Sequence, residues 1–530
     1  MISLLLFSVA GLDAAQTLSS PPGADFFGTT QVHQIRITLP AGAMAALRNN
    51  PRQDVAASVQ MGTNRWSEVA VHLKGSTGSF RPVDDKPGLT LNFDRILPGR
   101  RFHGLSRIHL NNSVEDPGCL NEWLGSELFQ AARLPAPRVT HAVVELNGRR
   151  LGLYVLKEGF TPEFLSRYFR DTTGNLYDTG RGHDIDELLE KDLGANPDDR
   201  SDLKALTAAA REPDLKKRWA QLQQTLDMDR FLSFMALEIM LGHRDGYCLA
   251  RNNFRIYHDP EQNRMVFLPH GMDQLLGNPD ASVQPMMNGL LARAVLETPE
   301  GRAQYRQRCE SLLTNVFRTA IIQRQIAQRL GQLRPVLNDA ESKVVTEAAT
   351  SLQSRATTRR QSLVEQLAAP PLPVIRFHKG VASLSTLLWK PVDGPEGGGL
   401  ERTTQNGRPV LVIHAGPVTA ASWRGRAILP QGRYHFAALA RTASVHPLPF
   451  GRNQGAALRV TGSARSRISL TGTQDWKALQ VDLEVTAPEQ EVEFICELRA
   501  SRGEAWFDLG SLRLERIQPS EPPDITFDKP

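Results

Sequence analysis

A proline-rich segment, AAPPLPV at 368–374, divides this chain into two parts with different residue patterns. Proline removes a backbone donor and fixes φ, so this cluster disfavours helix and central strand and is typical of a linker. Before the segment, alternating strand-like runs are interspersed with long helix-forming stretches. After it, only short alternating runs separated by Gly, Pro and Asn occur. The sequence therefore predicts an α+β part followed by an all-β, jelly-roll-like sandwich.

These patterns predict five segments along the 530 residues. We expect a folded α+β domain over 32–366, a linker over 367–373 and the sandwich over 374–519. Residues 1–16 are expected to be a signal peptide, and residues 520–530 are expected to form a tail. A chain of this length can support two or three domains, each with its own apolar core.

The N-terminus, MISLLLFSVAGLDAAQ, has an apolar run from Ile2 to Ala10 followed by small residues. This pattern resembles a secretory signal peptide, although no Lys or Arg precedes the apolar run. The run is too short to span a bilayer, and no other stretch is apolar enough to predict a transmembrane helix. We therefore expect a secreted or cell-envelope protein of a bacterium. The alternative is a cytoplasmic protein in which this run is an ordinary buried strand.

Composition excludes several classes of protein. Hydrophobic residues make up 41% and charged residues 22%, as in ordinary folded soluble proteins. The net charge is +5, but no Lys/Arg block carries interleaved aromatics, so we expect no nucleic-acid partner. The four cysteines form no CxxC pair, which argues against a zinc site and a dense disulfide framework. Hydrolase motifs such as GxSxG and HExxH are absent from the sequence.

The polar residues of the stretch Gly242–Gly277 are the strongest chemical signal in the chain. A helical pattern ends before Asp245, and Asn252 and Asn253 precede the extended segment FRIYHDP. After a turn, a second extended segment, RMVFLP, leads to Asp273. Two acids and two amides around one hairpin suit a magnesium–nucleotide site, because Mg²⁺ prefers hard oxygen ligands. The simpler interpretation is a solvated turn between two strands.

A glycine-rich turn lies between two predicted strands near the N-terminus. The turn GSTG begins with Gly75 and Ser76, directly after Lys74, and Lys86 precedes the next strand, GLTLNFD. Backbone N–H groups of such a turn can bind phosphates. Most turns of this composition are only turns.

Helix signals start at two acidic residues. Asp116 is a plausible N-cap with Pro117 at the first helical position, which places Glu122 and Glu127 on the polar faces of the helix. A second helix is predicted over 215–242 with Asp214 as its cap. That helix would deliver the tripeptide HRD, which ends in the acid of the hairpin stretch. Between the two helices, the dipeptide NG flanked by VTHAVVEL and LGLYVLKEG predicts a β-hairpin.

Residues from about 32 to about 366 resemble the CotH kinase family, named for spore coat protein H. The resemblance rests on an ordered series of motifs: HLKGSTGS, NNSVEDPGCLNEWLGSELFQAARLPAPR, VVELNGRRLGLYVLKE, GNLYD, RDGY, NNFRIYHDP, VFLPHGMDQLLG and LLARAVLETPEGRAQYRQR. It implies a divergent protein-kinase-like fold with a β-rich part and a helical part.

The resemblance also implies roles for the polar residues of the hairpin stretch. Asp245 is similar to the catalytic-loop acid that orients and deprotonates the acceptor hydroxyl. Asp273 is similar to the metal-binding acid, and Asn252 or Asn253 to the amide that helps to hold the metal. The tripeptide containing Asp245 echoes the HRD of ordinary kinases, but here the amides follow seven or eight residues later.

Nucleotide-binding roles are implied for residues nearer the N-terminus. Lys86 is the first choice for the phosphate-pairing lysine, and Lys74 is the second. Glu122 is expected to be its helix partner, with Glu127 as the alternative. The turn that contains Gly75 and Ser76 is expected to cover the phosphates.

One departure from the family pattern concerns the second acid. The family often shows Trp-Asp-x-Asp where this chain has His270-Gly271-Met272-Asp273. If the missing carboxylate supports a second metal, the protein is expected to bind nucleotide weakly or to transfer slowly. A pseudokinase is therefore an open alternative.

The C-terminal part more faintly resembles jelly-roll carbohydrate-binding modules, chiefly through AWFDLGSLRLERI. Four aromatics, Trp423, Tyr434, Trp476 and Trp506, have side chains that stack well on sugar rings. For each of them, a place in the sandwich core is the better expectation. The resemblance thus leaves polysaccharide as a further expected partner.

Taken together, the resemblance implies an atypical protein kinase. It would use ATP with Mg²⁺ or Mn²⁺ and transfer the γ-phosphoryl group to Ser, Thr or Tyr hydroxyls of an exported or surface protein. The alternative from another class is a non-catalytic envelope or spore-coat-like scaffold with a polysaccharide-binding tail. Nucleotidyl transfer by the same groups is a third option.

Overall fold

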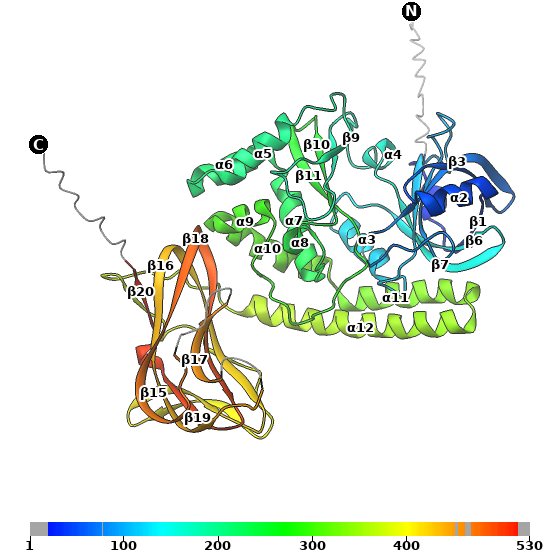
Figure 1. Ribbon diagram of the computed structural model, residues 1–530. Coiled ribbons are helices and arrows are strands. Elements are labelled where there is room, and N and C mark those ends of the chain that lie inside the picture. The colour runs from blue at the N-terminus through cyan, green and yellow to red at the C-terminus, as the bar shows by residue number, and fades with distance from the viewer. Residues whose placement is uncertain (1–19, 77, 451–453, 462–467, 518–530) are drawn as a thin grey trace, which may run out of the picture. The chain divides into compact units, whose positions relative to one another are not determined.

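The computed structural model in Figure 1 describes residues 20–76, 78–450, 454–461 and 468–517. The expected signal peptide over 1–16 and the expected tail over 520–530 lie outside the described residues. The chain forms two compact units. The first comprises Met1–Ala209, Leu222–Ala292 and Gln304–Leu367, and the second comprises Ala210–Gln221, Arg293–Ala303 and Ala368–Pro530. The expected mixture of helices and strands, followed by a β-rich sandwich-like part, is confirmed.

The N-terminal portion of the first unit is a closed β-barrel, drawn in blue and cyan in Figure 1. Its strand order is β1-β2-β3-β4-β5-β7-β6, and a parallel β1–β6 pair closes it. Alternate side chains enter the interior, where Val71, Leu89 and Leu110 are fully buried. The strands are β1 (His33–Thr38), β2 (Val55–Met61), β3 (Asn64–Lys74), β4 (Gly88–Asn92), β5 (Arg107–Asn111), β6 (Val139–Leu146) and β7 (Arg149–Glu158).

The predicted NG hairpin joins β6 to β7 and is confirmed. Asn147 and Gly148 both have positive φ, 49° and 81°, as a two-residue hairpin turn requires. β7 then returns through the barrel and carries Lys157 into its buried end. The turn chemistry of two residues therefore sets the register next to the turn, where Leu146 pairs with Arg149. A register shift between Val144 and Glu145 precedes the pairing of Val139 with Lys157.

The helix predicted to begin at Asp116 begins later, and that boundary was wrong. Helix α3 covers Asn121–Ala131, because Cys119 adopts a positive φ of 56° and interrupts helical geometry. Asp116 still satisfies the helix end: its Oδ2 accepts a hydrogen bond from the Asn121 N–H at 2.7 Å. The N-cap position belongs to Leu120, so Asp116 is not the N-cap, but its side chain satisfies the first N–H of the helix from five positions before it.

The long helix predicted over 215–242 is two helices, α6 (Leu215–Thr225) and α7 (Met228–Met240). The break occurs where the Asp227 N–H donates to the Met265 carbonyl at 3.0 Å, which draws the chain towards a neighbouring strand. Asp227 then caps α7 by accepting from the Arg230 N–H at 3.1 Å. A long-range backbone bond of this kind leaves no trace in local periodicity.

The hairpin expected after α7 is confirmed as β10 (Phe254–Asp259) and β11 (Arg264–Pro269). It belongs to a sheet of order β11-β10-β8-β9, with β8 at Leu176–Asp178 and β9 at Glu190–Leu193. The short helix α8 (Tyr247–Ala250) lies between α7 and β10.

The remaining helices follow or interrupt these sheets. They are α1 (Ala24–Phe27), α2 (Ala41–Asn49), α4 (Pro162–Leu165), α5 (Ser201–Arg211), α9 (Leu290–Glu297), α10 (Pro299–Asn315), α11 (Thr319–Leu333) and α12 (Asp339–Ala368). Of the helices in the described ranges, none combines the length and the apolarity that a membrane crossing needs.

The second unit is dominated by long antiparallel strands, of which β16 (Thr419–His446) and β18 (Gly472–Ala500) pair along much of their length. Trp423 and Tyr434 lie in its apolar core, as expected. Trp506 is also buried, in a smaller cluster against which Trp476 packs. The other strands are β12 (Val381–Ser383), β13 (Lys390–Val392), β14 (Gly399–Gln405), β15 (Arg408–His414), β17 (Gly455–Val460), β19 (Arg502–Asp508) and β20 (Arg513–Arg516).

Candidate active site

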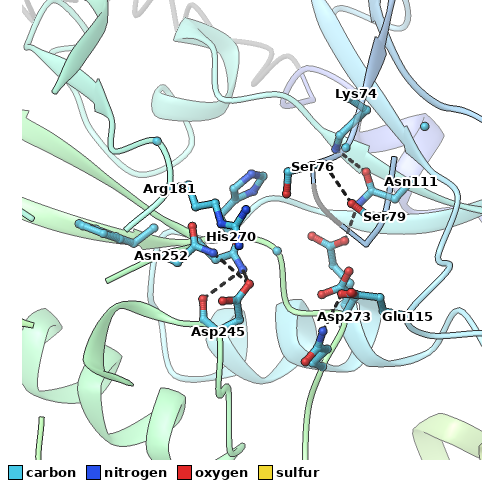
Figure 2. Close-up of a pocket in the computed structure, with 18 of the residues that line it drawn as sticks. Lys74, Ser76, Ser79, Asn111, Glu115, Arg181, Asp245, Asn252, His270 and Asp273 are labelled. Atoms are coloured by element: carbon cyan, nitrogen blue, oxygen red, sulfur yellow. Dashed lines mark hydrogen bonds between the residues drawn. The ribbon is translucent and has the colours of Figure 1, made fainter. Parts of the chain in front are cut away.

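A cavity of about 640 Å³ lies in the first unit, between barrel strands and the loops around the β10–β11 hairpin. Figure 2 shows Asp245 and Asn252 on one side and Lys74 with Asp273 on the other. Eight of the predicted site residues line it: Lys74, Gly75, Ser76, Glu122, Asp245, Asn252, Asn253 and Asp273. Predicted site residues from positions as far apart as 74 and 273 thus line one cavity.

Asp245 is held by both amides that follow it. The Asn252 Nδ2 donates to Asp245 Oδ2 at 3.0 Å, and the Asn253 Nδ2 donates to the same oxygen at 2.8 Å. Asn253 also donates to the Asp245 carbonyl at 3.1 Å. These bonds fix the carboxylate and leave its second oxygen for another partner. A carboxylate positioned in this way can accept a proton from a hydroxyl group.

Gly271 lies against Asn253. Its φ is +54°, and an added Cβ would meet the Asn253 Oδ1 at 2.4 Å and its Cγ at 2.6 Å. The Asn253 side chain therefore occupies the space that any side chain at position 271 would enter. The departure from the family pattern at Gly271 is sterically coupled to the amide that orients Asp245.

His243 links the loop of Asp245 to the loop of Asp273. Its ring is fully buried, with Nε2 3.1 Å from the Gly271 carbonyl oxygen and Nδ1 3.6 Å from Glu238 Oε1. Burial lowers its pKa, but Glu238 and the Gly271 carbonyl outweigh this, so the pKa of His243 is raised. Glu238 also accepts from the N–H groups of Tyr247 and Cys248, at 3.0 and 2.9 Å. A buried network thus fixes the spacing of the two loops.

Lys74 presents the ammonium group in the cavity. It ends β3 and hydrogen-bonds to Asn111. Burial, reinforced by the positive charge of Lys157, lowers the pKa of Lys74 to about 8, while Glu122 and Asp273 oppose the shift. An anionic ligand would restore the charged form, which suits a lysine that binds phosphate.

Glu122 pairs with Lys157, a residue that the sequence reasoning missed. The Lys157 Nζ lies 2.6 Å from Glu122 Oε1, and only 1% and 3% of the two side chains are exposed. Lys157 also donates to His270 Nδ1 at 2.6 Å. Burial first, and then Lys157, keep the pKa of His270 well below its ordinary value, so the ring accepts as a neutral imidazole. A lysine inside the apolar run LGLYVLKEG was the available signal.

Two other predicted residues lie elsewhere. Lys86 is not among the described residues that line the cavity, and its Nζ lies 5.1 Å from the centre of the Tyr154 ring. Glu127 is also absent from the described lining. Burial raises the pKa of Glu127, and the charge of Arg329 partly opposes this. The structure therefore brings Lys74 and Glu122 to the cavity, but not Lys86 or Glu127.

The glycine-rich turn approaches the cavity through Gly75, Ser76 and Ser79. Gly75 has a φ of +108°, and an added Cβ would lie 3.1 Å from the Phe80 backbone, so the tight turn needs glycine there. Arg52 donates to the carbonyls of Leu73 and Gly75, which fixes the start of the turn. These bonds leave the turn beside the ammonium group of Lys74.

Asp273 lies opposite Asp245 in a region of negative charge. Burial raises its pKa to about 7, and the nearby carboxylates Glu122 and Glu115 add to the shift. Its backbone carbonyl accepts from Asn121 Nδ2 at 2.7 Å, which ties the loop to helix α3. A cation bound there would relieve the charge that raises this pKa.

The donors present fit a magnesium ion that arrives with phosphates. No trio of His, Cys, Asp or Glu within the described ranges lies close enough to form a metal cage. Mg²⁺ rarely uses such a cage, since it usually takes one or two carboxylates, substrate phosphates and water. Asp273 and Asp245 offer carboxylates, and Asn252 and Asn253 offer amide oxygens.

Comparison with known proteins gives a consistent family match. The family model described as "CotH kinase protein" matches residues 71–367. The chain is 24% identical to inner spore coat protein H of Bacillus subtilis (strain 168), over 46% of this chain and 72% of that protein. It is 23% identical to invasin CotH2 of Rhizopus delemar, over 61% of this chain and 60% of that protein.

Two solved carbohydrate-binding modules are distantly similar to part of the chain. A galactotriose complex of the carbohydrate-binding module TmCBM61 is 16% identical, with a TM-score of 0.18, over 24% of this chain and 88% of that one. A family 35 carbohydrate-binding module of Clostridium thermocellum is 12% identical, with a TM-score of 0.16, over 24% and 90%. These scores are too low to assign a fold or a ligand.

Proposed function

The chain belongs to the CotH kinase protein family, and on that premise we propose that it is a metal-dependent phosphotransferase. It would bind ATP with Mg²⁺ or Mn²⁺ in the cavity of the first unit and phosphorylate hydroxyl side chains of a protein. The observation that carries this proposal is the convergence of Lys74, Asp245 and Asp273 on one cavity. A kinase needs these three kinds of group: a cation for phosphates, an acid for the acceptor and an acid for metal.

Each residue has a defined part in the proposed reaction. Lys74 would bind phosphate oxygens, with the turn at Gly75 and Ser76 covering them. Asp273 would hold the metal, assisted by the amide oxygen of Asn252 or Asn253. A magnesium ion supplies charge neutralisation for the phosphates when it is bound.

Asp245 would orient the acceptor hydroxyl and take its proton as the oxygen attacks the γ-phosphorus. The bond from that phosphorus to the β,γ-bridging oxygen would break, and ADP would leave. The fixed position of Asp245 matters because phosphoryl transfer depends mostly on placement and electrostatics. The buried Lys157–Glu122 pair would hold α3 against the barrel and so keep Lys74 and Asp273 at their present spacing. In this arrangement the chain resembles a divergent kinase.

The relatives supply a proposal for where the protein acts. One is named as a spore coat protein and another as an invasin, and we place this protein likewise at a cell or spore surface. Its acceptor would then be a Ser, Thr or Tyr of an exported protein, with polysaccharide as a further partner of the second unit.

The test is calorimetric titration of the intact chain with ATP, with and without Mg²⁺. We expect metal-dependent binding that Asp273→Asn abolishes. Transfer of labelled γ-phosphate to a protein acceptor should then fail in Asp245→Asn, while ATP binding persists. Asp178→Asn, which changes a lining carboxylate paired with Arg255, is the matched control and should retain metal-dependent binding.

A second candidate is a non-catalytic surface scaffold. The absence of a carboxylate at Gly271 favours it, because the family pattern has there an acid that would support a second metal. Failure of the intact chain to bind ATP up to millimolar concentration, with or without metal, would support the scaffold and refute the phosphotransferase.

A further inference from the structure

The walls of the cavity are polar almost throughout. Of its 24 described lining residues, 19 have polar or charged side chains, four are glycines and one, Phe254, is apolar. Sites for drug-sized or cofactor ligands are usually lined mostly by apolar and aromatic groups. A nucleobase in particular gains affinity by stacking on a flat apolar or aromatic surface. The described lining offers little of that kind.

Phe254 does not serve as a stacking surface. Only 1% of the residue is exposed. Its ring stacks on Phe267, with centroids 5.5 Å apart and planes 3° apart, and lies 4.5 Å from the Tyr247 ring. The faces of this ring are therefore occupied by the core.

The remaining planar groups discriminate poorly between bases. Arg181 and Arg244 line the cavity and carry flat guanidinium groups. Guanidinium groups stack on any base, since every base has a π face. The His270 ring is fixed by Lys157 at one nitrogen and by an edge-on contact with Phe160, 5.6 Å between centroids.

The charged side chains of the lining indicate that any polyphosphate must bind together with a metal ion. Arg52, Lys74, Arg181 and Arg244 supply four cationic side chains, against five carboxylates from Glu115, Glu122, Asp178, Asp245 and Asp273. The cavity alone therefore has no positive excess to offset a triphosphate, and a divalent cation must supply it.

We propose that this cavity recognises its phosphoryl donor by the metal–polyphosphate group and not by the base. This inference rests on the proposed function and specifies its donor class. The site then accepts purine and pyrimidine nucleoside triphosphates alike, and it also binds inorganic tripolyphosphate.

The test is calorimetric titration of the intact chain with ATP, GTP, CTP and tripolyphosphate, each with and without Mg²⁺. We expect the three nucleotides to bind within about fivefold of one another, and tripolyphosphate within about tenfold, all only with metal. Lys74→Met should weaken all four in parallel. Lys86→Met, which removes a similar ammonium group outside the cavity lining, is the control and should weaken none.

Two results would overturn the inference. If ATP binds more than about thirtyfold tighter than CTP, or if tripolyphosphate fails to bind while ATP binds, the base is recognised, and the proposed phosphotransferase still stands. If none of the four ligands binds, both the phosphotransferase and this donor class are refuted.

Discussion

At the scale of single residues, Gly271 and Asn253 depend on each other. We expect Gly271→Ala to displace the Asn253 amide, because the new Cβ would lie 2.4 Å from its Oδ1. Asp245 then loses a hydrogen-bond partner, and γ-phosphate transfer should fall by tenfold or more, roughly the effect of losing about 1.4 kcal/mol of positioning. Labelled phosphate transfer measures this.

The control for that substitution is Gly99→Ala. Gly99 has a φ of +84° and nothing within 4 Å of its built Cβ, so the variant carries only the backbone strain. Equal transfer rates in the two variants would mean that the contact with Asn253 has no effect on Asp245.

The buried pair of Lys157 and Glu122 predicts a large effect on stability. Lys157→Met leaves Glu122 without its closest cation, and breaking one side of a buried pair typically costs about 3–5 kcal/mol. Denaturant unfolding should show this loss, and the double variant with Glu122→Leu should recover part of it. Lys86→Met, on a half-buried lysine, should cost far less. Similar losses of unfolding free energy in Lys157→Met and Lys86→Met would contradict a stabilising role for the pair of Lys157 and Glu122.

The raised pKa of Asp273 predicts a pH-dependent stability of the ligand-free protein. Burial, with Glu122 and Glu115, raises this pKa from 3.8 to about 7 in the folded state. The protonated carboxyl therefore favours folding below about pH 4, and that contribution is lost as the pH rises towards 7. Asp273→Asn mimics the protonated form, so it should match the wild type at pH 4 and exceed its unfolding free energy at pH 8.

Denaturant titrations of both proteins at the two pH values measure the difference. A wild type that equals Asp273→Asn at pH 8 would show that this carboxylate carries no excess negative charge in the folded protein.

At the scale of elements, Arg359 on α12 fixes the C-terminal end of α7. Its fully buried guanidinium donates to the carbonyls of Ile239 and Met240, at 2.9 and 3.0 Å, and to that of Pro279 at 3.0 Å. Arg359→Met should leave the carbonyls of Met240 and Pro279 without this donor, at about 1–3 kcal/mol for each buried group. The Ile239 carbonyl keeps a bond from the Gly242 N–H at 3.1 Å. Since α7 leads directly to Asp245, transfer should fall as well.

Thermal unfolding and phosphate transfer check this prediction. Arg324→Met removes an exposed arginine from α11 and should change neither quantity. An Arg359→Met variant as stable as the wild type would show that water can donate to these carbonyls in place of the guanidinium.

Elements with local signals could be predicted from the sequence, and elements set by distant contacts could not. The turn at Asn147 and Gly148 carries its own chemistry, so the hairpin was predictable, whereas the register shift between Val144 and Glu145 was not. The break before α7 depends on a bond from Asp227 to Met265, which no local pattern records. The order of motifs along the sequence likewise predicted that Asp245 and Asp273 belong to one site. The pairing of Lys157 with Glu122 could not be predicted, because the position of β7 depends on closure of the barrel, in which β5 lies between β4 and β7.

At the scale of the whole molecule, the cavity belongs to one unit. Every described lining residue lies between positions 52 and 274 and within the first unit. The second unit combines Ala368–Pro530 with two short helical segments, and an ion pair joins Arg302 of one segment to Glu489 of β18. The strands of the second unit thus stabilise helical segments that come from earlier in the chain.

A chain that ends at Leu367 should therefore lose stability and keep its affinity. The segments 210–221 and 293–303 lose their partners in the second unit, which lowers the melting temperature. Calorimetry should still give metal-dependent ATP binding within about threefold of the intact chain, about 0.7 kcal/mol by the usual logarithmic relation. Arg302→Ala is the milder control, with the same direction in stability and no change in affinity. If the truncated chain folds by circular dichroism yet binds no nucleotide, the second unit contributes to the site, and a purely surface-binding role for it is wrong.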